Sequence, residues 1–275
     1  RLECSSIHIG GGEPFLNLSE LEMVVETCRR AGIWIEYAET NSVWYKGLDS
    51  ACEILSSLKE KGLSALLVSM SPFHNEHIPF FKVKGVMEAC RAVGINVFPW
   101  ISDFYDEMDA FDDRKTHTLS DYEDRYGKDY LVKLPSRYWI HPGGRALKTY
   151  SRILELRPYE DIVSSDPGGC RELTDVSHFH VDLFGNYIPG LCSGLAIHYK
   201  DLGDRISPDR YPFLHTLFRK GISGLLDTAS TAYGFKPLAG YISKCHLCFE
   251  IRRYLVRDKG IKAREFQPDG FYEHS

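Results

Sequence analysis

The pattern of apolar and polar positions in the first hundred residues alternates between two periods. Four short apolar runs predict β-strands, at 5–9, 33–38, 65–68 and 95–101. Between them, apolar residues spaced three and four apart predict amphipathic helices, at 16–31, 48–61 and 82–93. A glycine ends each helix just before the next strand, at Gly32, Gly62 and Gly94. One strand and one helix in about 30 residues predict a parallel sheet with right-handed crossovers, whose strands end at one common edge.

The rest of the chain follows a different pattern, and we expect a second domain there. An acidic and aromatic stretch at 103–114 predicts a solvated surface helix. Further on, two short apolar segments on either side of a turn at Gly185 predict a hairpin, at 178–182 and 187–189. The last helices are expected at 211–218, 222–233 and 249–256. We place the boundary between the two domains at 155/156.

Composition and charge exclude several classes of protein. Of the 275 residues, 43% are hydrophobic and 26% are charged, which is typical of a globular protein. The net charge of −5 gives no electrostatic footprint for nucleic acid or an anionic membrane. No apolar run approaches the roughly 20 residues of a membrane span, and no signal peptide is present. We therefore expect a cytoplasmic protein without a nucleic-acid or membrane partner.

A glycine turn with a single acid follows the first predicted strand. Gly10 to Gly12 permit positive φ and a close approach of the backbone to a ligand, and Pro14 stiffens the exit. Glu13 lies at the carboxyl end of a strand, where parallel α/β folds bind their ligands. A lone acid in such a turn suits a cationic group such as an amine. An ordinary turn with a solvated Glu13 accounts for these residue types equally well.

The other strand ends also carry polar residues. Residues of this kind cap helices, and capping alone explains any one of them. Four successive strand ends nevertheless bring polar side chains to one edge, which predicts a polar rim. Its members after Glu13 are Thr40, Asn41, Ser69, Ser71, His74, Ser102 and Asp103.

The sequence Gly11-Gly12-Glu13-Pro14 after an apolar strand resembles the GGEP motif of the radical S-adenosylmethionine (radical SAM) enzymes. The resemblance implies an α/β fold, a partial (β/α)6 barrel that is incomplete at its N-terminus. It also implies that Gly11, Gly12 and Glu13 hold the amino group of S-adenosylmethionine, and that Asn41 and Ser69 contact its methionine and ribose portions. Ser71 and His74 are weaker matches for the same cofactor. In this family a reduced [4Fe–4S] cluster cleaves S-adenosylmethionine to a 5′-deoxyadenosyl radical, which abstracts hydrogen from the substrate.

The eight cysteines divide into two groups. Four are isolated on helix or strand patterns and are expected in the core or on helix faces, namely Cys4, Cys28, Cys52 and Cys90. The others lie in loop-like sequence, where a chain without a secretory signal favours metal over disulfides, namely Cys170, Cys192, Cys245 and Cys248. Four thiolates suit a [4Fe–4S] cluster or a structural zinc. A redox CxxC and unligated thiols are the alternatives, and a ligand could be replaced by His178, His180 or His246.

The order of these four cysteines resembles the auxiliary-cluster domains, named SPASM or twitch, that follow radical SAM barrels. Gly185 stands where that family has its hairpin glycine, and the resemblance implies a small α+β auxiliary iron–sulfur domain at 156–275. Because no cysteine follows Cys248, at most one auxiliary cluster fits, as in the shorter twitch type. The CxxxCxxC motif that binds the catalytic cluster is not in this chain. We expect that the motif lies ahead of Arg1 and has been cut off, rather than lost from the protein. A polypeptide without it is expected to be inactive in radical chemistry.

The expected function is that of a radical SAM enzyme that needs an electron donor and acts on an unknown substrate, a peptide or a small molecule. One alternative is a non-catalytic binding protein with a decayed barrel and a structural zinc or iron–sulfur site. Another is a metal-free α/β barrel enzyme, which would leave the CxxC without a role. The sequence identifies neither the substrate nor the type of reaction.

Overall fold

The computed structural model describes residues 4–138, 140, 143–203 and 205–273, and it divides into two compact units. The first unit ends at Tyr138 and the second contains the rest of the chain. This division falls before the predicted boundary at 155/156. The reason is helix α8 (Gly144–Tyr150), whose Leu147 packs in the hydrophobic core of the second unit.

The first unit is built on a four-stranded parallel sheet, which confirms the predicted α/β class with parallel strands. The strands follow chain order across the sheet: β1 (Ser6–Ile9), β2 (Trp34–Thr40), β3 (Ala65–Val68) and β4 (Asn96–Pro99). The segments between them form η1 (Pro14–Leu16), α1 (Leu18–Ala31), α2 (Leu48–Lys61) and α4 (Phe80–Val93).

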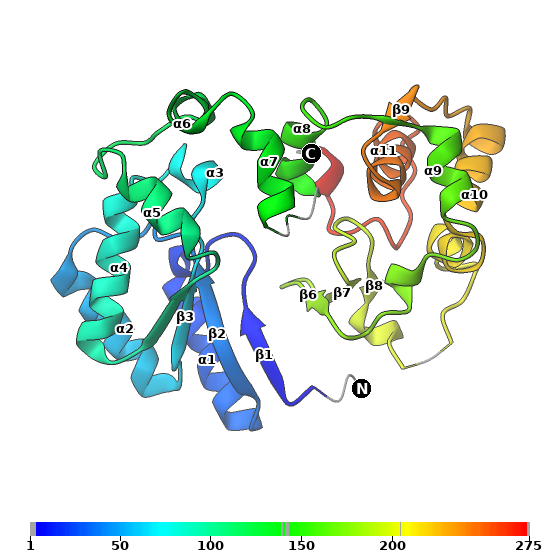
Figure 1. Ribbon diagram of the computed structural model, residues 1–275. Coiled ribbons are helices and arrows are strands. Elements are labelled where there is room, and N and C mark those ends of the chain that lie inside the picture. The colour runs from blue at the N-terminus through cyan, green and yellow to red at the C-terminus, as the bar shows by residue number, and fades with distance from the viewer. Residues whose placement is uncertain (1–3, 139, 141–142, 204, 274–275) are drawn as a thin grey trace. The chain divides into compact units, whose positions relative to one another are not determined.

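Helices α1, α2 and α4 lie along the same face of this sheet (Figure 1). Val25, Leu55 and Val86, one from each helix, have no exposed surface, and all four residues of β3 are buried. Gly32 and Gly94 end α1 and α4 in the left-handed conformation, at φ 70° and 72°. Apolar stripes at helical spacing and glycine caps are therefore enough to account for this half of the fold.

The opposite face of the sheet carries aromatic and polar side chains. The register runs from Ile7 opposite Ile35 to Ile9 opposite Ala38, so β2 contains one extra residue, a bulge. Within the bulge, Tyr37 stacks on His8, with ring centroids 5.1 Å apart, and meets the edge of the Phe98 ring at 5.5 Å. Strands β1, β2 and β4 thus each contribute a ring system to one surface.

Short helices complete the first unit, namely α3 (Pro72–Asn75), α5 (Asp103–Asp109), α6 (Leu119–Tyr126) and α7 (Tyr130–Arg137). The acidic stretch forms α5, as expected, but it is not simply a solvated helix. Phe104 and Met108 are each 1% exposed, so its apolar side is part of the core. The spacing of the apolar residues Phe104 and Met108, four apart on one side of the helix, decided its position rather than the acids.

The second unit combines helices with small antiparallel sheets. Its main sheet contains β6 (Phe179–Val181), β7 (Asn186–Pro189) and β8 (Ile197–His198), and β5 (Arg157–Pro158) pairs with β9 (Gly240–Tyr241). Its longer helices after α8 are α9 (Tyr159–Ser165), α10 (Pro212–Tyr233) and α11 (Lys244–Arg257). The remaining elements are the short η2 (Arg171–Leu173), η3 (Tyr199–Asp201) and η4 (Phe271–Glu273).

The predicted hairpin is confirmed, because β6 and β7 pair in antiparallel fashion around a turn in which Gly185 has φ 79°. A Cβ on Gly185 would also come within 2.6 Å of the Tyr199 ring. The third strand of this sheet, β8, is followed directly by η3. Its Ile197 pairs with Tyr187 of β7, a long-range contact that local composition does not encode.

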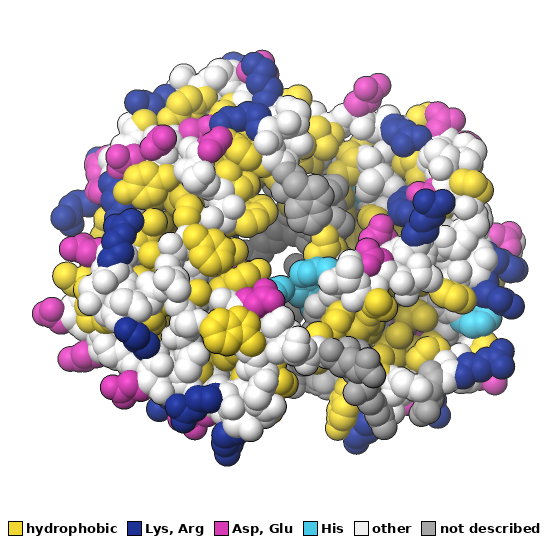
Figure 2. Space-filling model, turned by 60° about the horizontal axis from the view of Figure 1, so that its bottom comes forward, with side chains coloured by type: hydrophobic (Ala, Val, Ile, Leu, Met, Phe, Trp, Pro, Cys, Tyr) yellow, Lys and Arg dark blue, Asp and Glu magenta, His cyan; other side chains and the backbone are white. Residues whose placement is uncertain are grey.

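The distribution of surface charge and the length of the helices bear on whether the protein could bind nucleic acid or a membrane. On the face shown in Figure 2, cationic and anionic side chains are interspersed and form no large area of one sign. Within the described part of the chain, no helix has both the length and the apolar character needed to cross a bilayer.

Candidate functional site

Glu13 is held at the carboxyl edge of the parallel sheet by three hydrogen-bond donors. Its Oε1 accepts from the backbone N–H of Phe15 (3.2 Å) and from the hydroxyl of Thr40 (2.9 Å). Its Oε2 accepts from the backbone N–H of Asn41 (2.6 Å). Burial raises the pKa of Glu13, and these three hydrogen bonds only partly oppose that shift. A carboxylate offers about four acceptor positions, so one remains for a further donor.

Thr40 organises this edge. Its hydroxyl donates to Glu13 and accepts from the backbone N–H of Ser42 (3.0 Å) and from the indole N–H of Trp44 (2.8 Å). Trp44 in turn stacks on Phe15, with ring centroids 4.6 Å apart and planes 6° from parallel. The residues on either side of Pro14 are therefore both fixed from the end of β2. From the sequence, Thr40 was expected only as one polar residue among several.

The glycine turn next to Glu13 lies against open space. Gly11 and Gly12 have φ 82° and 42°, which only glycine adopts without strain. A Cβ built on either of them would meet no atom within 4 Å. Crowding by the protein therefore does not explain these glycines, whereas the backbone conformation does.

The other predicted rim residues differ in their hydrogen bonds. Asn41 follows Thr40 directly, and its Oδ1 accepts from the backbone N–H of Val43 (2.9 Å), which leaves its amide N–H groups for another partner. Ser69 extends the sheet ladder, because its backbone N–H donates to the carbonyl of Thr40 (2.8 Å). The hydroxyl of Ser71 is buried at the start of α3 and forms a hydrogen bond with Nδ1 of His74 (2.8 Å).

Ser42 is a strained residue that the sequence did not reveal. It has φ 69°, in the left-handed region, and is the one non-glycine residue of the described chain with positive φ. Its hydroxyl is buried and has no hydrogen-bond partner within the described structure. Strain and unpaired polar atoms of this kind concentrate at functional sites.

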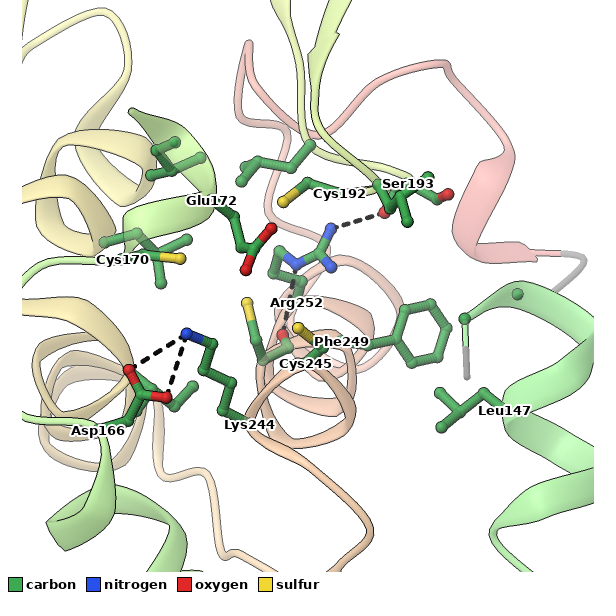
Figure 3. Close-up of a pocket in the computed structure, with 18 of the residues that line it drawn as sticks. Leu147, Asp166, Cys170, Glu172, Cys192, Ser193, Lys244, Cys245, Phe249 and Arg252 are labelled. Atoms are coloured by element: carbon green, nitrogen blue, oxygen red, sulfur yellow. Dashed lines mark hydrogen bonds and ion pairs between the residues drawn. The ribbon is translucent and has the colours of Figure 1, made fainter. Parts of the chain in front are cut away.

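A second candidate site is a cavity of about 70 Å³ in the second unit (Figure 3). Since about 10–15 Å³ is enough for one water molecule, the cavity has room for a group of several atoms. All four late cysteines line it, although they come from three separate segments: Cys170 before η2, Cys192 after β7, and Cys245 with Cys248 at the start of α11. No disulfide joins them.

Helix α11 fixes the CxxC pair. The side chain of Ser243 caps the helix by accepting from the backbone N–H of His246 (3.2 Å). Cys245 and Cys248 follow in the first turn, three residues apart, and so lie on the same side of the helix. The predicted opening of a last helix by the CxxC is therefore confirmed.

Cys170 is fixed by a close approach of two backbone segments. Helix α10 is interrupted at Gly221, which has φ 62° and ψ −152°. A Cβ on Gly221 would come within 1.9 Å of the carbonyl oxygen of Gly168, and one on Gly169 within 2.1 Å of the carbonyl oxygen of Phe218. The backbone N–H of Cys170 then donates to the carbonyl of Leu217 (2.9 Å). Only glycine at these positions permits the loop before Cys170 to lie on the kinked helix.

Three of the thiols that line this cavity are poor acids. Burial raises the pKa of Cys170, and it raises the pKa of Cys192 and Cys245 to about 12. Neighbouring thiols add to the shift, Cys248 acting on Cys245. Metal binding to such thiols would release their protons, so the free energy of binding would have to exceed the free energy needed to deprotonate them.

Two cations lie beside the thiols. The ammonium of Lys244 is 3.1 Å from both carboxylate oxygens of Asp166. Arg252 is only 5% exposed, and its guanidinium points toward the loop of Cys192 and Ser193 (Figure 3). Burial lowers the pKa of Arg252, but Tyr272, Cys248 and Cys192 raise it by more, so the group stays charged. Sequence reasoning missed Arg252, although its position four residues after Cys248 places it one helical turn further on the same side.

Several predicted ligands lie elsewhere. His178, His180 and His246 are not among the residues that line the cavity. Within the described ranges, no group of three or more His, Cys, Asp or Glu side chains is arranged to hold a metal ion. Of the early cysteines, Cys28 and Cys90 are buried in the core, as predicted, whereas Cys4 is exposed.

The sequence matches no protein-family model and no curated protein at a significant level. The function therefore has to be inferred from the geometry of these two sites.

Proposed function

We propose that this chain acts as part of the radical SAM class of enzymes. Its first unit would be a partial barrel that holds S-adenosylmethionine at Glu13, and its second unit would bind one auxiliary [4Fe–4S] cluster. The observation that carries the proposal is the convergence of four cysteines from three distant segments on one cavity: Cys170, Cys192, Cys245 and Cys248.

The arrangement of these thiols favours a cluster over zinc. Four thiolates bound to one zinc at about 2.3 Å would have to lie within about 3.8 Å of one another. Among the described side chains no group of three or more ligands is arranged to hold a metal ion, so the thiols would have to move toward either kind of centre when it binds. A cluster of several iron atoms spreads its ligands around a larger centre, and a shared cavity with room for several atoms suits it. The adjacent charge of Arg252 suits the anionic character of a centre with four thiolates.

The edge of the sheet fits the amino acid portion of S-adenosylmethionine. Glu13 retains an acceptor position for an ammonium group, and the glycine turn beside it lies against open space. The amide N–H groups of Asn41 are available to a carboxylate. When bound and reduced by one electron, S-adenosylmethionine supplies a 5′-deoxyadenosyl radical. The protein's part is to bind and orient it, and no residue of this chain is proposed to hold the catalytic cluster.

Metal analysis of the anaerobically prepared chain tests the proposal. After reconstitution with iron and sulfide we expect about four irons and four sulfides per chain. Replacement of any one late cysteine, for example Cys192→Ser, should reduce this content sharply. Cys52→Ser, which removes a thiol of helix α2 in the first unit, is the matched control and should leave it unchanged. Stoichiometric zinc without iron, or equal iron content in both variants, would refute the auxiliary cluster.

A binding measurement tests the sheet edge separately. S-adenosylmethionine should bind to the wild-type chain in equilibrium dialysis and bind more weakly to Glu13→Gln, because the amide loses the negative charge that pairs with the ammonium group. Glu60→Gln, on the exposed side of α2, is the control. Equal binding by the wild type and Glu13→Gln would remove Glu13 from the proposal without affecting the cluster.

A further inference from the structure

Arg252 is the most deeply buried charged group beside the cysteine cavity. Its Nε donates to the carbonyl of Cys248 (3.3 Å), and its Nη1 donates to the carbonyl of Ser193 (3.0 Å) and to the hydroxyl of Tyr272 (2.6 Å). All three acceptors are uncharged. These bonds fix the guanidinium in place, but they do not neutralise its charge, and a buried charge without a counter-charge is costly.

No carboxylate of the described chain forms an ion pair with Arg252. Two acids line the same cavity, Asp166 and Glu172. Asp166 is paired with Lys244, and Glu172 is exposed, so that solvent screens its charge. The two N–H groups on Nη2 of Arg252 make no hydrogen bond to a described residue and are available to a group in the cavity.

We propose that Arg252 is the fixed counter-charge of the thiolate centre, which donates from Nη2 to cysteine sulfurs and raises the reduction potential of the bound cluster. This inference rests on the proposed function. One-electron reduction adds a negative charge to a centre that four thiolates already make anionic. A nearby positive charge and N–H···S hydrogen bonds stabilise the reduced form more than the oxidised form.

The position of Arg252 suits this role better than a purely structural one. Helix α11 places it one turn beyond Cys248, and the ring of Tyr272 lies 5.7 Å from its guanidinium carbon. Tyr272 also donates to the carbonyl of Gly194 (2.6 Å), so the partner of Arg252 is itself fixed. Arg252 lines the cavity together with Cys248 and Ser193, so its guanidinium is held at the cavity wall.

The test is a redox titration of the reconstituted chain, followed by the electron paramagnetic resonance signal of the reduced cluster. In Arg252→Met we expect the ratio of reduced to oxidised cluster at a fixed potential to fall about tenfold, which corresponds to 59 mV for one electron. Arg252→Lys, which keeps the charge, should lie between the two. Arg253→Met is the control, since Arg253 is the neighbouring residue of the helix and pairs with Glu250.

The outcomes separate this inference from the proposed function. A wild-type chain that binds no iron would overturn both. Iron content and potential in Arg252→Met equal to those of the wild type would overturn only the role of Arg252. If Arg252→Met folds by circular dichroism but holds no cluster, Arg252→Lys decides: retained iron supports the counter-charge, and lost iron indicates a structural role instead.

Discussion

The two candidate sites are built in opposite ways. At the edge of the parallel sheet, Glu13, Thr40 and Asn41 meet because neighbouring strands end side by side, and their contacts are ordinary hydrogen bonds between strand ends. In the cysteine cavity, Cys170 is positioned by a loop that lies directly on the kinked backbone of a distant helix. The first site is held together by hydrogen bonds of polar side chains. The second depends on glycines, whose lack of a side chain lets two backbone segments approach closely, so mutations should damage the two sites differently.

The largest effect is expected at Gly221, where the second site is most tightly constrained. Gly221→Ala would force a residue with a side chain to φ 62° and ψ −152°, which essentially only glycine adopts, and would drive a Cβ to within 1.9 Å of the carbonyl oxygen of Gly168. We expect a loss of about 3 kcal/mol in the free energy of unfolding and a loss of bound iron. Denaturant unfolding and iron analysis measure the two effects.

Gly234→Ala is the matched control for that change. Gly234 ends the same helix with φ 74°, but the nearest atom to its added Cβ is the Tyr254 hydroxyl at 3.9 Å. It should cost only the left-handed conformation, about 1 kcal/mol, and leave iron binding intact. Equal effects of the two substitutions would show that the contact with Gly168 contributes nothing.

The next effect is expected at Thr40 in the first unit. Thr40→Val removes a hydroxyl that serves Glu13, Ser42 and Trp44 at once, and leaves buried donors without an acceptor. We expect a loss of about 1–3 kcal/mol in the free energy of unfolding. Thr40→Ser keeps the hydroxyl and should retain most of the stability. A harmless Thr40→Val would mean that the sheet edge is held by something other than this network.

A gain in stability is expected at Ser42. Ser42→Gly removes an unpartnered buried hydroxyl and relieves the left-handed conformation, while it adds backbone freedom to the unfolded chain. The net result should be a gain of about 1 kcal/mol in denaturant unfolding. If S-adenosylmethionine binding weakens in the same variant, the strain at Ser42 belongs to the site. Unchanged binding would make it a purely structural feature.

The smallest effect is a dependence of stability on pH in the second unit. Glu265 is fully buried, and its Oε1 accepts from the backbone N–H groups of Phe213 (2.8 Å) and Leu214 (3.2 Å), while Oε2 has no hydrogen bond to a described residue. Burial raises the pKa of Glu265 above its ordinary 4.5, against the effect of these bonds. The folded chain then holds the proton more tightly than the unfolded chain.

The sign of this dependence follows directly. The folded state is favoured most below about pH 4.5, and it loses that advantage as the pH rises through the raised pKa. Glu265→Gln cannot titrate, so the stability of the wild type relative to this variant should fall as the pH rises from 4.5 to neutrality. Denaturant midpoints at several pH values measure it. A constant difference between the two proteins would mean that Glu265 stays ionised when the protein folds.

Local patterns in the sequence predicted much of the first unit. The range Leu48–Lys61 and the range Ala65–Val68 were predicted with the bounds that the structure has, because apolar period and glycine caps act over only a few residues. The bulge in β2 was not predicted, since it depends on pairing with β1, and it decides which face Tyr37 lies on. The same applies to the left-handed Ser42, whose conformation nothing in the local sequence requires.

By itself, then, the sequence determined the alternation of strands and helices, the glycine–acid turn at Glu13, and the hairpin and CxxC that carry late cysteines. Only the tertiary structure decided that Cys170, Cys192, Cys245 and Cys248 line one cavity, and that Arg252 is buried beside it without a carboxylate partner among the described residues. The physical reason is the distance along the chain over which each kind of interaction acts. Periods and caps are fixed by interactions within a few turns of chain, whereas a shared cavity depends on close packing between segments far apart in sequence.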